Sequence, residues 1–275
     1  MKKFLAVLMA VMLLALTFAG CSSSGDDTNE ESTADTATEA AEVVDDLATI
    51  TAKGTLVVGI TDYAPMDYKE EGSDEWTGFD AEFATAFAES LGVTVEFIEI
   101  DWDNKFFELE SGEIDCIWNG MTITDEVKLN TSVSDPYVVN KQVVVMAADV
   151  IDNYADAESM AELSFAVESG SAGESAAADN GLTYTAVNTQ SDALMEVASG
   201  NSDACIIDST MADAMTGEGT DYADLTSGLV LTDEEYGVGF RTNSNLTEVF
   251  NEYLVSAKDD VITPLAEKYD LVLAY

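Results

Sequence analysis

The sequence of 275 residues carries 54 acidic residues against 10 basic ones, for a formal net charge of −44, and contains no histidine. A surface this acidic repels nucleic acid and the anionic faces of membranes, so we expect no nucleic-acid partner. With no histidine and only three cysteines, the chain lacks the ligands of the usual zinc and transition-metal sites, and we expect neither a metal nor a cofactor.

Residues 1–20 have the pattern of a signal peptide. Two lysines precede an apolar run over residues 4–16, which is shorter than the roughly 20 residues that a membrane-spanning helix needs. Small residues then lead to Cys21, whose thiol would accept a lipid after cleavage, although Phe18 stands where bacterial lipoprotein signals usually carry Leu. We therefore predict lipidation of Cys21 and a location on the extracellular face of the cell membrane. The alternative is an ordinary secretory signal in which Cys21 has no role.

Residues 21–50 are rich in Ser, Thr, Ala, Asp and Glu and contain almost no large apolar side chain. Such a segment cannot form a hydrophobic core. It is predicted to be an acidic, flexible tether between the lipid anchor and the folded part of the chain.

The folded part opens with a β-α-β pattern. Residues 56–60 form a short apolar run typical of a buried strand. Large apolar residues then recur every four positions over residues 79–91, which predicts an amphipathic helix with Asp80 as a capping acid at its start and Gly92 at its end. Residues 93–98 have the composition of the next strand, so we expect a right-handed crossover and a largely parallel sheet.

One structural unit is repeated in the chain. Residues 107–118 and residues 193–207 each have the pattern of a helix that ends at Ser-Gly, turns through an Asp and enters an apolar strand. The repeat predicts two α/β lobes that face each other across a cleft. Because ligands of open α/β sheets bind beyond the carboxyl ends of strands, residues 119–122 in one lobe and Asp208 in the other are candidate site residues.

The two remaining cysteines, Cys116 and Cys205, lie in short apolar runs in different halves of the chain. Buried free thiols fit that setting, whereas a disulfide between the halves would restrict their motion.

Six short motifs follow one another along the folded part: Gly-Thr-Leu-Val-Val-Gly at 54–59, Tyr-Ala-Pro-Met at 63–66, Trp-Thr-Gly-Phe-Asp at 76–80, Gly-Met-Thr-Ile-Thr at 120–124, Ser-Asp-Pro-Tyr at 134–137 and Tyr-Gly-Val-Gly-Phe at 236–240. In this order they resemble the type 3 extracellular solute-binding proteins of amino-acid ABC transporters, which are lipoproteins in many bacteria. The resemblance implies an α/β, two-lobe periplasmic-binding-protein-like fold of type II. Lobe 1 would comprise residues 54–138 and 237–275, and lobe 2 residues 142–233. The family also implies a monomer that binds a small molecule, such as an amino acid, and delivers it to a membrane ABC permease.

The same resemblance implies a set of ligand contacts in lobe 1. Tyr63 and Trp102 match two aromatic positions that sandwich the ligand, and flat rings suit an aliphatic or cationic group; core packing is the alternative for each ring. Asn119, Gly120 and Thr122 match strand-end groups that hold the ligand's ammonium and carboxylate, with Gly120 allowing close approach. The predicted contacts from lobe 1 are Asp62, Tyr63, Trp102, Asn119, Gly120 and Thr122.

In lobe 2, the predicted contacts are the helix start Ser171, Ala172 and Gly173, together with Asp208. Backbone amides at a helix start suit a carboxylate, although a glycine turn with a helix cap has the same sequence pattern. Asp208 matches the acid that pairs with the ligand's ammonium, and such an acid is costly to bury without a partner. Its alternative role is the N-cap of a helix that begins at residue 209.

One position departs from the family pattern. The family usually carries Thr-x-Glu-Arg after its Gly-Met-Thr-Ile segment, where the arginine clamps the ligand's carboxylate, but here Val127 occupies the arginine position. Valine cannot donate a hydrogen bond, and a lysine nearby would be a point charge without the paired donors of arginine. Either backbone amides hold the carboxylate, helped by Lys105, Lys128 or Lys141, or the ligand is a cationic or neutral metabolite without that group.

Three functions are open at this point. The first is a receptor that captures a solute by lobe closure for an ABC importer. The second is a small dehydratase-like enzyme on the same fold, with Glu168, Glu174 or Glu235 as its carboxylate, but no spacing of residues indicates a catalytic site, so we expect a binding protein. The third is an amine-binding or sensor protein that takes no part in transport.

Overall fold

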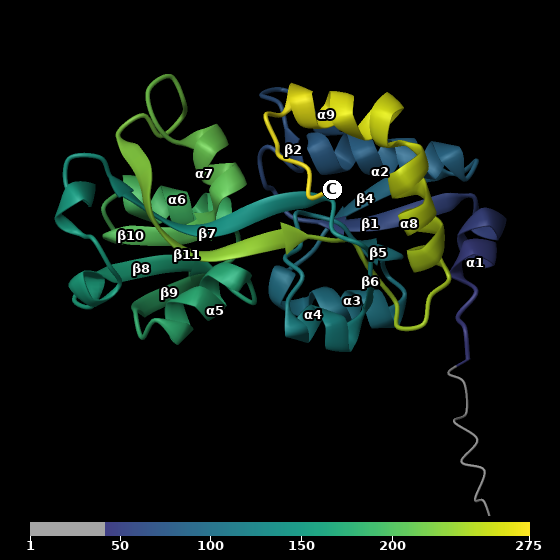
Figure 1. The fold of residues 1–275 in the computed structure, drawn as a ribbon, viewed down its shortest axis with the longest axis horizontal. Coiled ribbons are helices and arrows are strands. Elements are labelled where there is room, and N and C mark those ends of the chain that lie inside the picture. Colours follow the sequence, from purple (N-terminus) through teal and green to yellow (C-terminus); the bar gives the residue numbers. More distant parts are fainter. Residues whose placement is uncertain (1–41) are drawn as a thin grey trace, which may run out of the picture. The chain divides into compact units, whose positions relative to one another are not determined.

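The computed structural model describes residues 42–275. The signal peptide predicted over residues 1–20, Cys21 and most of the predicted tether lie outside the described residues. Within residues 42–275, no helix is both long enough and apolar enough to cross a membrane. The described residues form two five-stranded sheets. Each sheet is flanked by helices (Figure 1), and we refer to the two sheets with their helices as lobe 1 and lobe 2.

Lobe 1 is built on a parallel sheet that contains one antiparallel strand. β1 pairs in parallel with β4 and β5, as the β-α-β pattern predicts, while β12 comes from the C-terminal part of the chain and runs antiparallel to both of its neighbours. Across the sheet the strands are β4 (Thr94–Glu99), β1 (Thr55–Ile60), β5 (Cys116–Ile117), β12 (Gly239–Phe240) and β6 (Ser132–Val133). The remaining elements of this lobe are α1 (Asp46–Lys53), the hairpin β2 (Tyr68–Lys69) and β3 (Trp76–Thr77), α2 (Phe79–Ser90), η1 (Trp102–Asn104), α3 (Lys105–Ser111), α4 (Asp125–Asn130), α8 (Leu246–Ser256), the π-helical turn η4 (Lys258–Ile262) and α9 (Thr263–Lys268).

The core of lobe 1 is aromatic because α2 presents a ring at every fourth position. Phe79, Phe83 and Phe87 are fully buried. The rings of Phe83 and Phe87 lie 4.9 and 6.1 Å from that of Trp118, and 5.7 and 5.1 Å from that of Phe250 on α8. Burial of each such side chain contributes about 1.5–3 kcal/mol, so this cluster fixes α2 and α8 on the sheet.

The start of α2 differs from its prediction. The N-cap is Gly78, at φ 118°, and a Cβ there would meet the Met66 carbonyl oxygen at 2.2 Å. Asp80 lies inside the first turn, is completely buried, and accepts hydrogen bonds from the Gly120 amide (2.6 Å) and the Tyr137 hydroxyl (2.8 Å). The acid therefore connects α2 to the strand end after β5, a contact over 40 residues that local pattern could not indicate.

Lobe 2 has three parallel strands bordered by two long antiparallel ones. Its strands, in order, are β11 (Leu225–Tyr236), β7 (Val138–Ala147), β10 (Ala204–Asp208), β8 (Ser164–Glu168) and β9 (Thr183–Val187). Its helices are η2 (Ile151–Asn153), η3 (Glu158–Met160), α5 (Ala172–Asp179), α6 (Gln190–Ala198) and α7 (Ser209–Met215). β7 starts and β11 ends at the paired residues Val138 and Tyr236, and Tyr236 also bridges to Thr122 of lobe 1. The chain thus passes between the lobes along these two strands.

The predicted repeat is present in both lobes. α3 ends at Gly112 and leads into β5, and α6 ends before Gly200 and leads into β10. The aspartate of each turn makes an equivalent contact: the Val57 amide of β1 donates to Asp115 and the Ser164 amide of β8 donates to Asp203, both at 2.8 Å, which ties each turn to the neighbouring parallel strand. Cys116 is the first residue of β5, and Cys205 is the second residue of β10. Both are buried and unpaired, as predicted.

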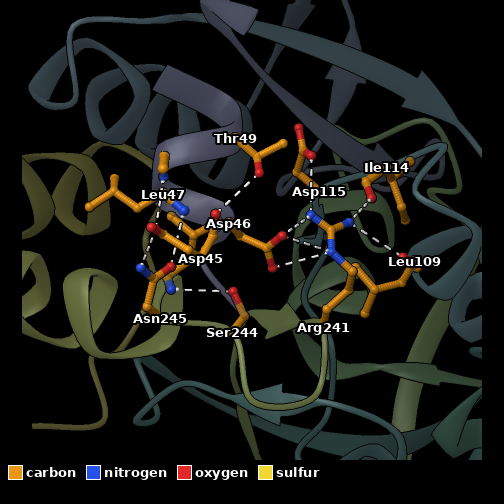
Figure 2. A network of polar contacts seen from close by, with 12 residues as sticks. Asp45, Asp46, Leu47, Thr49, Leu109, Ile114, Asp115, Arg241, Ser244 and Asn245 are labelled. Atoms are coloured by element: carbon orange, nitrogen blue, oxygen red, sulfur yellow. Dashed lines mark hydrogen bonds and ion pairs between the residues drawn. The ribbon is translucent and has the colours of Figure 1, made fainter. Parts of the chain in front are cut away.

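The folded part begins earlier in the chain than the sequence predicted, because α1 belongs to it. The sequence predicted a tether up to residue 50, but α1 begins at Asp46 and is fixed by polar contacts to lobe 1 (Figure 2). The Arg241 guanidinium lies 2.8 Å from Asp46 and 3.4 Å from Asp115, and it donates to the Ile114 carbonyl at 2.8 Å. These partners are distant in sequence, which is why composition alone extended the tether too far.

We predict that Arg241→Met destabilises the protein by about 2 kcal/mol, because Asp46 and Asp115 lose their shared cation in a largely buried site. That change corresponds to a fall of about 4–8 °C in melting temperature, measured by calorimetry. Lys141→Met is the matched control: its ion pair with Asp233 is 3.7 Å long and exposed, so a change within about 0.5 kcal/mol is expected. Equal melting temperatures for the two variants would contradict the role assigned to Arg241.

Candidate functional site

A cavity of about 360 Å³ has walls from both lobes. Lobe 1 contributes the turn η1, the strand-end segment after β5 and the start of α4, and lobe 2 contributes the ends of β8 and β10, the start of α5 and part of β11. The lining residues are Trp102, Lys105, Asn119, Gly120, Met121, Thr122, Thr124, Asp125, Glu126 and Val127 on one side, and Glu168, Gly170, Ser171, Ala172, Ser175, Ala176, Asp179, Gln190, Asp208, Thr232 and Glu234 on the other. Most of these groups follow a strand, which is the location that open α/β sheets favour for ligands.

The structure brings seven of the ten predicted contacts to this cavity: Trp102, Asn119, Gly120, Thr122, Ser171, Ala172 and Asp208. Gly173 lies behind the wall, where a Cβ would meet the Ile206 carbonyl oxygen at 2.7 Å. It therefore serves the close packing of α5 on β10. Asp62 is exposed and does not line the cavity, and its carbonyl accepts a hydrogen bond from Ser191 of lobe 2.

Tyr63 is placed differently from the prediction of a ring that sandwiches the ligand. Its side chain is 1% exposed, and its hydroxyl shares hydrogen bonds with those of Thr210 and Tyr236. The ring packs behind Gly120, where a Cβ would meet it at 2.7 Å. Tyr63 thus supports the cavity wall from the core and joins lobe 1 to Thr210 of lobe 2, which is the core-packing alternative for this residue.

Trp102 forms the aromatic wall together with Lys105. The Lys105 ammonium lies 5.0 Å from the centre of the Trp102 ring and donates to the Trp102 carbonyl (3.2 Å) and to the Gly170 carbonyl of lobe 2 (2.8 Å). Burial lowers the pKa of Lys105. This ammonium is therefore bound to two carbonyl groups, and its bond to Gly170 links the lobes at a point separate from β7 and β11.

Buried acids hold the lobe 1 wall from behind. The Asn119 side chain donates to Asp67 (2.8 Å) and to the Thr61 carbonyl (3.0 Å), while the Gly120 amide donates to Asp80. Burial, and next the charge of Asp80, raises the pKa of Asp67 well above its usual range, and burial raises the pKa of Asp80 to about 7. Asn119 and Gly120 are thus positioned by two buried acids whose pKa values are raised.

Asp208 is saturated by amide donors. Side-chain amides of Asn140, Gln142 (2.8 Å) and Gln190 donate to its carboxylate. Burial, and next the charge of Glu234, raises the pKa of Asp208 to about 7. Asp208 also occupies the N-cap position of α7 (Ser209–Met215), as the alternative predicted, but its side chain makes no capping bond to that helix. Asp208 is instead the centre of an acid–amide network on the cavity wall.

The network contains residues that the sequence analysis did not find. Glu234 on β11 accepts from Thr122 of lobe 1 (2.9 Å) and from Gln142 (3.0 Å). Asn140 and Gln142 are buried at alternate positions of β7, where residues 139 and 141 are exposed. Two polar residues on the inward face of a strand, next to the apolar run 143–145, were the signal that could have identified this wall, because a buried amide needs a partner.

Glu168 is the last residue of β8, and its hydrogen bonding differs from that of Asp208. It is 3% exposed, lines the cavity, and among the described residues its Oε1 atom has no hydrogen-bond partner. Burial, and next the charge of Asp208, raises the pKa of Glu168 well above its usual range, while Lys105 acts in the opposite direction. Of the three carboxylates considered for catalysis, only Glu168 reaches the cavity; Glu174 accepts the Gly170 amide at the start of α5 (2.7 Å), and Glu235 is exposed.

Two-lobe α/β folds with a ligand cavity between the lobes define a class of binding proteins, and this chain has that architecture. Residues 56–271 match the bacterial extracellular solute-binding proteins, family 3. The chain therefore belongs to this family, and both its α/β class and its two-lobe type II fold are confirmed.

Among curated relatives, the chain is similar to the arginine-binding extracellular protein ArtP of Bacillus subtilis, with 29% identity and 94% of each chain covered. It is also similar to the glutamine-binding protein GlnH of the same organism, with 26% identity and 94% of each chain covered. Among solved structures, an amino acid ABC transporter substrate-binding protein of Streptococcus pneumoniae bound to L-arginine has a TM-score of 0.75 and 26% identity, covering 84% of this chain and all of that one. The ancestral amino acid-binding protein AncCDT-1, a precursor of cyclohexadienyl dehydratase, has a TM-score of 0.73 and 31% identity, covering 82% and 99%. These relatives are named as binding proteins.

The raised pKa values predict that the ligand-free protein loses stability as pH rises. A buried acid whose pKa is higher in the folded chain contributes stability that is complete below its unfolded pKa, near 4, and lost as pH passes the folded pKa. Asp67 and Asp80 act in this direction, as do Asp208 and Glu168. We expect a loss of roughly 2 kcal/mol, about 4–8 °C in melting temperature, between pH 5 and pH 8.

Asp67→Asn should reduce this slope, because asparagine keeps an acceptor for the Asn119 amide and cannot ionise. Thermal melts of both proteins at several pH values test the prediction. Asp152→Asn, which removes an exposed acid from η2, should leave the slope unchanged. A melting temperature of the unsubstituted protein that rises from pH 5 to pH 8 would refute the assignment.

Proposed function

We propose that this chain is the receptor of an ABC importer, held at the extracellular face of the membrane by a lipid on Cys21. It captures a polar amino acid or a similar small metabolite in the cavity between the lobes, closes around it, and docks on the permease as a monomer. The observation that carries this proposal is the cavity itself, since its walls come from both lobes and seven of the ten predicted contacts line it.

The arrangement of the lobes supports capture by closure. The chain passes between the lobes along β7 and β11, and side-chain contacts join the lobes on two other sides, at Tyr63–Thr210 and at Lys105–Gly170. A hinge at two strands with polar contacts across the opening is a known basis for domain closure. The domain limits proposed for this motion are residues 54–138 and 237–275 for lobe 1 and residues 142–233 for lobe 2.

Isothermal titration calorimetry of the purified protein tests the proposal. The panel consists of arginine, lysine, histidine, glutamine and cystine, together with amines that have no carboxylate. At least one compound should bind with a dissociation constant of about 10 μM or lower, and at one hundred times that constant it should stabilise the protein by about 2.7 kcal/mol. Absence of binding across the panel would contradict the proposal.

The aromatic wall provides a prediction for a variant. Trp102→Ala should weaken binding about 10- to 100-fold, since a large ring that borders the ligand is lost. Trp76→Ala is the matched control, because Trp76 lies on β3 and does not line the cavity. Equal dissociation constants for the two variants would place the ligand elsewhere.

An enzyme remains a second candidate because of one observation. Glu168 is a buried acid with a raised pKa on the cavity wall, and the solved relative AncCDT-1 is described as a precursor of a dehydratase. General acid–base catalysis needs such a group. Nuclear magnetic resonance of the bound ligand separates the two functions: recovery of intact ligand supports the receptor, and a new product supports the enzyme.

A further inference from the structure

The charge lining the cavity is almost entirely negative. Lys105 is the one basic side chain among the lining residues, and its ammonium already donates to two carbonyl groups. The acidic lining residues are Asp125, Glu126, Glu168, Asp179, Asp208 and Glu234. A surface with this balance attracts cations and disfavours an anionic group.

The lobe 1 side offers no side chain to clamp a carboxylate. Val127, at the position where the family resemblance implies arginine, is 3% exposed and packs in the apolar cluster with Trp102 and Met121. The Val127 amide donates to the Thr124 hydroxyl at 3.1 Å. Among the described residues that line the cavity, the paired donors that a carboxylate prefers are therefore missing on this side.

Glu168 is the buried acid of the cavity lining with unused hydrogen-bonding capacity. Asp208 and Glu234 accept from the amides of Asn140, Gln142 and Gln190 and from Thr122, whereas Glu168 Oε1 accepts from no group in residues 42–275. Glu168 also lies beyond ion-pair distance of Lys105, since the described ion pairs include no contact between them. Burial of an acceptor without a partner is costly, so a ligand that donates to it binds there favourably.

We propose that Glu168 recognises a cationic group of the ligand, a primary ammonium or a guanidinium, and that the ligands of this site include organic cations without a carboxylate. The inference rests on the proposed function and specifies its ligand class. A donor cation satisfies Glu168 Oε1 by a charge-assisted hydrogen bond, and Asp208 and Glu234 supply further negative charge on the same wall. The Trp102 ring provides a face for the apolar or cationic part of such a molecule.

This assignment has a proton linkage as a second signature. The charged groups that act on Glu168 are Asp208, Lys105 and Asp192; burial, and next the charge of Asp208, raises the pKa of Glu168 well above its usual range. A bound cation favours the ionised carboxylate, so binding displaces a proton and the affinity for a cation increases as pH rises toward 8.

The experiment compares ligands of matched shape on the full-length protein by isothermal titration calorimetry. Arginine against citrulline changes a guanidinium into a neutral group, and arginine against agmatine removes the carboxylate. We expect arginine to bind at least 100-fold more tightly than citrulline, agmatine to bind within 10-fold of arginine or better, and binding enthalpies to vary with the buffer because a proton is released.

Glu168→Gln should reduce the preference for arginine over citrulline at least 10-fold, while Asp152→Asn, which removes an exposed charge from the same lobe, should leave it unchanged. The ligand pairs measured on the unsubstituted protein keep the test valid if the Gln variant does not fold. Equal binding of arginine and citrulline, or binding of arginine but not agmatine, would overturn the inference and leave the proposed function standing. Absence of binding by every panel member would instead refute the proposed function and this inference together.

Discussion

The site depends on one constraint, which is that buried carboxylates must find partners. Asp208 and Glu168 end strands of lobe 2 on the cavity wall, whereas Asp67 and Asp80 are buried behind the lobe 1 wall, before β2 and in the first turn of α2. Asp67 and Asp80 have raised pKa values and accept hydrogen bonds from Asn119, Gly120 and Tyr137, so they support the wall from behind. Asp208 is surrounded by side-chain amides. Asp67, Asp80 and Glu168 each keep an oxygen without a partner, but of these three only Glu168 lines the cavity, and that position makes it the group through which a ligand is recognised.

The two lobes are built from the same unit, yet they contribute unlike chemistry. In each lobe a helix ends at glycine, an aspartate caps the neighbouring strand, and the following strand carries its polar residues toward the cleft. Lobe 1 offers the Trp102 ring, the Thr122 hydroxyl and the exposed acids Asp125 and Glu126, whereas lobe 2 offers the buried acids Glu168 and Asp208 with their neighbouring amides. Only in lobe 1 does the aspartate, Asp115, also contact an arginine, and that contact secures α1. Duplicated architecture thus provides two faces of a cleft that can evolve separate roles.

The contacts between the lobes link the fold to the proposed closure. The Thr122 hydroxyl of lobe 1 donates a hydrogen bond to Glu234 on β11, and the Tyr63 hydroxyl of lobe 1 shares a hydrogen bond with that of Thr210 in lobe 2. The Lys105 ammonium of lobe 1 donates a hydrogen bond to the Gly170 carbonyl of lobe 2, just before the start of α5. Each of these contacts joins the two lobes at or behind a cavity wall. A ligand that displaces residues of these walls therefore also shifts the equilibrium between open and closed arrangements of the lobes, as the proposed capture requires.

The sequence by itself determined the α/β class, the repeated unit, the helix α2 and the strand-end positions of Asn119, Thr122 and Asp208, because hydrophobic period and turn residues are local signals. Only the tertiary structure decided that Tyr63 packs behind Gly120, that Asp80 is buried instead of capping α2, and that α1 belongs to the folded part through Arg241. It also decided which acids are satisfied: the partners of Asp208 come from β7 and α6, far along the chain, while none reaches Glu168 Oε1 within the described residues. The physical reason is that the state of a buried charge depends on every group packed around it, and those neighbours are set by the fold and not by adjacent residues.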